Sequence, residues 1–151
     1  MVGLSKEPWI SCAVEVAPPQ MFGSPQGFER RCVPIVSAVI TGRINGRGLP
    51  GGTDWQRILP SGVAELEAHY ALETDQGELM EVYSNGMRSG PEEAMRDLLA
   101  GRPVDPALIY FRSAMRFISD APRLRDFTTR LFIGVGRRDP TRVYLEVHAV
   151  E

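Results

Sequence analysis

The clearest pattern along the chain is an alternation of apolar and polar residues, which predicts β-strands. In the segment 63–74, apolar side chains occupy every second position and polar ones lie between them: Ala64, Leu66, Ala68, Tyr70 and Leu72 against Glu65, Glu67, His69 and Glu73. The turn-forming residues 74–77 and a second apolar segment, 78–84, complete a predicted hairpin. We expect its polar row to face solvent, since antiparallel sheets commonly have one wet face.

Further strands are predicted where short apolar segments are separated by glycine and proline: 9–16, 32–41, 56–59, 108–118, 130–136 and 141–150. The segment 32–41 is apolar on both faces, which predicts a central strand that is covered on both sides. On 108–118, Phe111 alternates with the large polar residues Tyr110 and Arg112.

Helices are predicted in only two places. Pro91 and Gly101 mark the start and stop of one helix, whose apolar face is expected to lie against the sheet or close a barrel end. A single helical turn is expected within 122–128. Eight to ten strands, one or two short helices and no alternation of strand with helix favour a mainly β fold, an antiparallel barrel or sandwich.

Length and charge narrow the class of protein. A chain of 151 residues favours a single domain spanning 1–151. The net charge of −2 argues against a nucleic-acid partner, and no apolar run approaches the ~18 residues of a membrane span. The first eight residues lack a signal-peptide core, so a cytoplasmic location is expected. Cys12 and Cys32 are expected to be reduced and packed, with a single bridge as the alternative.

The most unusual stretch is the glycine-rich segment from Gly42 to Trp55. Its glycines indicate tight reversals or close approaches of the backbone. Trp55 is expected to plug an end of the core, which would hold Asp54 beside it. For Asp54 three roles are open: an Asx-turn with nearby amides, an ion pair that pins the loop, or a general acid or base at the mouth of a pocket.

Motifs for several other chemistries are missing. There is no nucleophile elbow and no phosphate loop, and the two histidines lie on different predicted strands, so no metal and no cofactor is predicted. The candidate catalytic residues are Asp54, Arg88 and Tyr110, with Arg88 or Arg112 holding a carboxylate or stabilising an enolate-like anion. Ligand-binding positions are predicted at Trp55, Phe111 and Arg112.

Several of these stretches together resemble domain-of-unknown-function family 3237, the UPF0311-like proteins. The similarity rests on Arg31-Cys32-Val33-Pro34-Ile35, Gly48-Leu49-Pro50-Gly51-Gly52-Thr53-Asp54-Trp55, Tyr70-Ala71-Leu72-Glu73-Thr74-Asp75-Gln76-Gly77, Asn85-Gly86-Met87-Arg88, Tyr110-Phe111-Arg112 and Phe132-Ile133-Gly134-Val135-Gly136. It implies a lipocalin-like antiparallel β-barrel that often assembles into oligomers. For some relatives it also implies metabolite tailoring, including ring closure in which a hydroxyl adds across an alkene. Two segments depart from the family pattern, Ser37-Ala38 and Arg125-Asp126-Phe127-Thr128.

Three functions follow as hypotheses. The first is a cofactor-independent acid/base enzyme acting on an apolar, oxygenated small molecule, for example by ring closure or isomerisation. The second is a lipocalin-like carrier of such a molecule, and the third is a structural module whose barrel is filled by side chains. A homo-oligomer is expected because exposed strand edges must be paired or covered.

Overall fold

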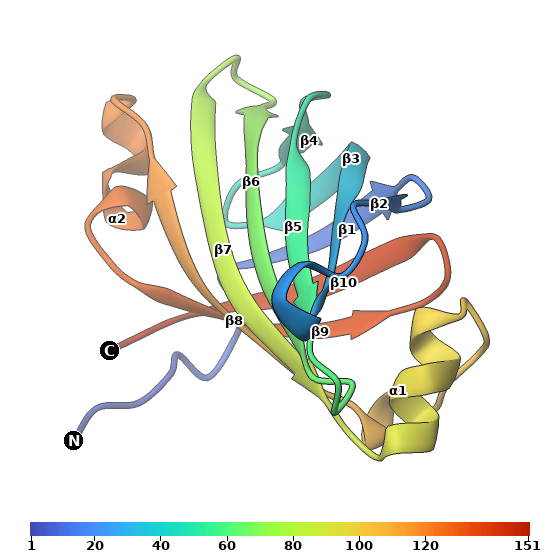
Figure 1. Cartoon of the computed structure of the whole chain (residues 1–151). Coiled ribbons are helices and arrows are strands. Elements are labelled where there is room, and N and C mark those ends of the chain that lie inside the picture. Colours follow the sequence, from blue (N-terminus) through green and yellow to red (C-terminus); the bar gives the residue numbers. More distant parts are fainter.

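The computed structural model describes all residues, 1–151, and shows one closed antiparallel β-barrel (Figure 1). The strands are β1 Ile10–Val16, β2 Gln20–Met21, β3 Glu29–Gly42, β4 Gly46–Gly48, β5 Thr53–Ile58, β6 Ala64–Thr74, β7 Leu79–Ser89, β8 Tyr110–Ile118, β9 Phe132–Arg138 and β10 Arg142–Ala149. The two α-helices are α1 Glu92–Leu99 and α2 Arg125–Thr128. The predicted mainly β fold with two short helices is confirmed.

The barrel has eight strand positions, because β4 and β5 share the place between β3 and β6 while β2 only extends one edge. It closes through the pairing of β1 with both β10 and β3. Closure removes the free edges that would otherwise template aggregation. Neither helix is long and apolar enough to cross a bilayer.

The two helices lie at opposite ends of the barrel (Figure 1). At one end, Phe127 of α2 packs with Trp9, Phe117 and Phe132, their ring centroids 5.1 to 5.8 Å apart and mostly edge to face. Aromatic rings favour this arrangement, and the four buried rings form the core at that end. At the other end, Met95 of α1 packs against the turn at Gly62. Each helix therefore covers one end of the barrel.

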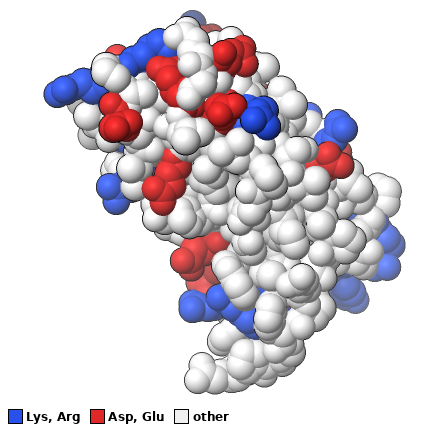
Figure 2. Space-filling view, turned by 90° about the horizontal axis from the view of Figure 1, so that it is seen from above, with Lys and Arg blue, Asp and Glu red and all other residues white.

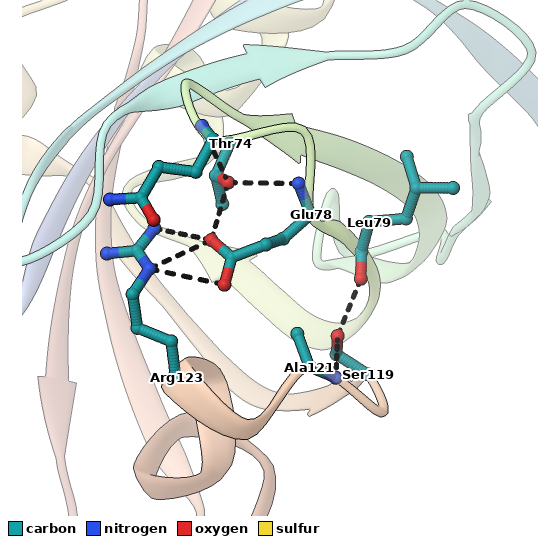
Figure 3. A network of polar contacts seen from close by, with 7 residues as sticks. Thr74, Glu78, Leu79, Ser119, Ala121 and Arg123 are labelled. Carbon is teal, nitrogen blue, oxygen red and sulfur yellow. Dashed lines mark hydrogen bonds and ion pairs between the residues drawn. The ribbon is translucent and has the colours of Figure 1, made fainter.

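An ion-pair network ties the α2 end to the β6–β7 turn (Figure 3). The Arg123 guanidinium Nε donates to both carboxylate oxygens of Glu78, at 2.9 and 3.2 Å. The Thr74 hydroxyl donates to the same carboxylate at 2.8 Å and accepts from the Glu78 amide at 3.2 Å. Ser119 Oγ donates to the Leu79 carbonyl at 2.6 Å, which fixes the approach to this helix. These contacts hold the segment around α2 over its end of the barrel.

Most of the predicted strand faces are confirmed. On β6 the polar row, which includes Glu65 and Glu67, faces solvent, and the alternate apolar residues are buried. The expectation that residues 32–41 are covered on both sides is wrong, because Val36 and Val39 remain 48% and 60% exposed. A single-walled barrel has only one interior, so outward side chains of β3 such as Val36 and Val39 stay exposed. Cys12 and Cys32 are buried and free, which confirms packed thiols and excludes the bridge.

The glycine-rich segment is required for close backbone packing. A Cβ added at Gly46 would lie 2.4 Å from the carbonyl oxygen of Glu73, and one at Gly52 would lie 2.4 Å from the Cβ of Tyr70. Real Cβ atoms do not approach other atoms this closely. These glycines let the link between β4 and β5 lie directly on β6, which sets where β5 begins and therefore where Asp54 lies.

We expect Gly52→Ala to lower the free energy of unfolding by about 1–3 kcal/mol, as overpacking typically does. The measurement is urea denaturation of the variant beside wild type. Gly51→Ala gives the comparison, since nothing lies within 4 Å of its Cβ position and only its positive φ of 105° opposes the change. Equal stability of Gly52→Ala and wild type would contradict the close approach.

Candidate functional site

The barrel interior contains a cavity in its middle and toward the α1 end. It encloses about 520 Å³ of space free of atoms, a figure that includes its open mouth, so the enclosed part has room only for a compact molecule. The space exists because the middle of the wall is built from small inward-facing residues, Ala68, Ser84 and Ser113. At the α2 end the corresponding positions hold large aromatic rings. Side chains therefore fill the α2 end of the barrel more fully than its middle.

The wall of the cavity is mostly apolar, with a few polar groups placed among aliphatic side chains. The aliphatic part comes from Val14, Val16, Ile35, Leu66, Ala68, Val143 and Leu145. The polar part comes from Asp54, Tyr70, Ser84, Arg88 and Ser113. Ser84 and Ser113 satisfy each other through a hydrogen bond between their hydroxyls. Asp54 and Arg88 are the only ionic side chains in the lining.

Asp54 is oriented by a chain of hydrogen bonds along the inner face of the barrel. The Arg31 Nε donates to Gln56 Oε1 at 2.8 Å, and the Gln56 Nε2 donates to Asp54 Oδ2 at 2.8 Å. Because a guanidinium only donates, Arg31 fixes which end of the fully buried Gln56 amide faces Asp54. The second carboxylate oxygen, Oδ1, is buried and has no hydrogen-bond partner. Asp54 is thus held through one oxygen and leaves the other free.

The surroundings of Asp54 favour its protonated form. Burial raises the pKa of the Asp54 carboxyl, and this outweighs the Gln56 hydrogen bond, the charges of Arg88 and Arg138 and the nearby backbone amide of Glu67, which all lower it. A carboxyl whose pKa is raised exchanges protons closer to neutral pH, as a general acid or base requires. Asp54 forms no ion pair and no Asx-turn, so two of the three roles open from the sequence are wrong for this conformation.

Arg88 lies on the inner face of β7, one residue before the end of that strand. It is 1% exposed, and its guanidinium lies 5.5 Å from the ring of Phe111. Its Nε and Nη2 are buried without hydrogen-bond partners. Burial is the main cause that lowers the pKa of Arg88 to about 9, so the group still carries its charge at neutral pH. A buried, charged group with free donors is rare unless a partner is supplied.

The structure brings three of the six predicted site residues to the interior and leaves three outside. Asp54, Arg88 and Phe111 line the cavity. Tyr110 and Arg112 lie on the outer face of β8 with the Arg112 guanidinium 5.2 Å from the Tyr110 ring, and its Nη1 donates to the Phe111 carbonyl. Adjacent residues of a strand point to opposite faces, so Tyr110 and Arg112 cannot join Phe111 in the cavity.

Trp55 does not plug the core. It is 37% exposed on the outer face of β5, where it packs against Phe22 at 5.2 Å between ring centroids and lies under the guanidinium of Arg30 at 4.9 Å. The same alternation explains this, because Asp54 points inward and its neighbour must point outward. The core plug at a barrel end is formed by Trp9 instead.

Four interior residues were missed from the sequence: Arg31, Gln56, Tyr70 and Arg138. For Gln56 a signal was present, since its spacing of two from Asp54 places both on one face of a strand. Tyr70 is the phenol that lines the cavity, and burial raises its pKa well above the usual value. Arg31 and Arg138 join the site only through strand register, which a single sequence does not specify.

Comparison with known proteins places the chain in a family. A UPF0311 protein of Bradyrhizobium diazoefficiens is 40% identical over 121 residues, 80% of each chain. The crystal structure of a conserved protein of unknown function from Rhodopseudomonas palustris superimposes with a TM-score of 0.92 at 37% identity, covering 99% of this chain and 98% of the other. A beta-barrel like protein from Acinetobacter baumannii follows with 0.86 at 29% identity, covering 100% and 97%.

A more distant likeness concerns the fold alone. The structure of an enzyme from Penicillium herquei matches with a TM-score of 0.69 at 14% identity, covering 100% of this chain and 94% of that one. The family model described as protein of unknown function, DUF3237, matches residues 5–150. The chain belongs to the DUF3237 family, whose curated members here are UPF0311 proteins.

Proposed function

We propose that this barrel binds a small, largely apolar, oxygenated metabolite in its interior and converts it by acid/base chemistry without a cofactor. One observation carries the proposal. A carboxylate oxygen, Asp54 Oδ1, and two guanidinium nitrogens of Arg88 are buried without partners on the wall of the same apolar cavity. Buried polar groups are normally satisfied, so these are the groups that a ligand would complete.

The chemistry that suits this pair is a proton transfer next to an oxygen that gains charge. Asp54 in its ionised form accepts a proton from an O–H or activated C–H of the bound molecule. The electron pair left behind moves onto an oxygen that faces Arg88, whose positive charge stabilises it. The protonated Asp54 then returns the proton at another atom, so the product is an isomer or a closed ring and no oxidant or reductant is needed.

The apolar wall strengthens both parts of this mechanism. With water excluded, the attraction between Arg88 and a developing oxyanion is stronger than it would be in solvent. The chain from Arg31 through Gln56 holds the Asp54 carboxylate in one orientation, so little reorganisation is required. The enzyme from Penicillium herquei supports the proposal only by showing that a barrel of this fold occurs in an enzyme.

The test is a time course of metabolite conversion. Wild type, Asp54→Asn and the control Asp120→Asn, whose side chain is exposed and unbonded, are incubated with small-molecule extract of the organism that encodes the protein. Bound compounds are identified by native mass spectrometry and followed by chromatography. We expect a compound that wild type and Asp120→Asn bind and convert, and that Asp54→Asn binds unchanged. If wild type binds a compound without converting it, the protein is a carrier and the proposed enzymatic activity is wrong.

A further inference from the structure

The two free nitrogens of Arg88 belong to one edge of its guanidinium. Nε–H and Nη2–H point in parallel from the same side of the planar group, and it is this side that binds both oxygens of a carboxylate at once. Both are buried and unpaired, so the whole fork is free rather than one scattered donor. The fork therefore has the geometry of a carboxylate site that lacks its carboxylate.

The protein's own carboxylates do not fill this site. Arg31 is bonded to Gln56 and has Glu29 nearby, while Arg138 has Asp139 nearby. The electrostatic partner of Arg88 is Asp54 alone, which is hydrogen-bonded to Gln56 and not to Arg88.

Two further guanidiniums, those of Arg31 and Arg138, are close enough to act on Arg88 by repulsion. Asp54 acts on all three of these cations, but Arg31 also has Glu29 and Arg138 also has Asp139. Arg88 is the most deeply buried of the three and has no carboxylate apart from Asp54, which it shares.

We infer that the ligand of this cavity is a carboxylic acid, bound as its anion side-on to Arg88, with a compact apolar body among the aliphatic side chains of the wall. This rests on the cavity of the proposed function and narrows its substrate class. One carboxylate provides hydrogen-bond acceptors for both unpaired nitrogens of the fork. A phosphate dianion fits less well, because Asp54 would repel its second charge and the remaining wall offers few donors.

The position of Arg88 also orients the ligand. Arg88 lies toward the α1 end of the barrel. Asp54 on β5 pairs with Ala68 of β6, which pairs with Ser84 of β7, so Asp54 lies further from the α1 end than Arg88. A ligand whose carboxylate is bound by Arg88 would extend from there along the cavity wall toward Asp54. In this arrangement the acidic group binds the ligand to Arg88, and the reacting atoms lie in the part of the ligand that faces Asp54.

The experiment compares two molecules that differ in charge and hardly in shape, benzoate and benzamide, at neutral pH. Each is titrated into protein labelled with ¹⁵N while the Arg Nε–H resonances are recorded. We expect benzoate to shift the Arg88 resonance in a saturable way, with benzamide binding at least tenfold more weakly. Arg88→Gln is expected to lose the benzoate response, and Arg116→Gln, an exposed arginine on the outer face of β8, to keep it.

The outcomes separate this inference from the proposed function. Asp54→Asn keeps the fork and is expected to bind benzoate at least as well as wild type, although the same variant should abolish conversion. Equal binding of benzamide and benzoate would overturn the acidic ligand and leave acid/base conversion standing. Absence of any benzoate effect on Arg88 in wild type would also overturn it, and that comparison does not depend on the folding of any variant.

Discussion

Arg88→Met is expected to make the protein more stable while it removes binding of acidic ligands. Arg88 is charged, 1% exposed and without hydrogen bonds through Nε and Nη2, so the fold is destabilised by the loss of its hydration. Removing an unpaired buried charge relieves its desolvation cost, and replacing whole buried ion pairs by apolar side chains of similar volume is often stabilising by about 1–4 kcal/mol. We expect a gain of that order in the free energy of unfolding, measured by urea denaturation, together with loss of the benzoate response.

The control for this prediction is Arg116→Met. Arg116 is exposed on the outer face of β8, where a substitution is expected to change stability by no more than about 0.5 kcal/mol. If Arg88→Met instead lowered stability by several kcal/mol, Arg88 would be holding the barrel together. Its free donors would then have a structural explanation rather than a functional one.

The combination of stability gained and binding lost would identify Arg88 as a residue retained for function. A protein of this size has a net stability of about 5–15 kcal/mol, so a destabilising interior charge is a substantial fraction of the total. Within the cavity lining only Asp54 Oδ1 shares this lack of a partner, whereas Ser84 and Ser113 satisfy each other. The unsatisfied atoms therefore point to a ligand more directly than the cavity volume does.

The fold was predictable because alternation and turn residues act locally. The β6–β7 hairpin, the inward row of β8, helix α1 and the closing hairpin all follow from spacing within a few residues. The position of Arg88 was not predicted in detail, since the strand predicted over 78–84 continues as β7 to Ser89. Pairing with β8 provides the hydrogen bonds that extend the strand, and that pairing is a tertiary contact.

The site was predictable only in part, for reasons that differ among its residues. Asp54 and Arg88 could be selected as ionic residues beside glycine-rich stretches. Tyr110 and Arg112 were selected together with Phe111, although alternation along a strand excludes that combination. Arg138 approaches Asp54 across the barrel, and such closeness depends on closure and register, which no local pattern encodes. Sequence reasoning thus found the two central groups and missed the residues that orient them.

Asp54→Asn is expected to lower kcat/KM for the converted compound by about 10²–10⁴-fold, the usual contribution of a general acid or base. The amide has nearly the same shape and cannot exchange a proton, so binding should persist while turnover is lost. If the kcat/KM of the variant stays within threefold of the wild-type value, Asp54 does not act as the general acid or base. Tyr70 would then be the candidate proton donor in the cavity.

The pH dependence of wild type gives an independent check on the same residue. Because burial raises the pKa of Asp54, activity that requires its ionised form should rise with pH through a range above the ordinary aspartate value. Stability should change in the opposite direction. The native state favours the protonated carboxyl, so the free energy of unfolding contributed by this group falls as pH rises from the unfolded pKa through the folded one. In Asp54→Asn, both the rise of activity with pH and the fall of stability with pH should disappear. If either pH dependence persists in the variant, another titrating group causes it.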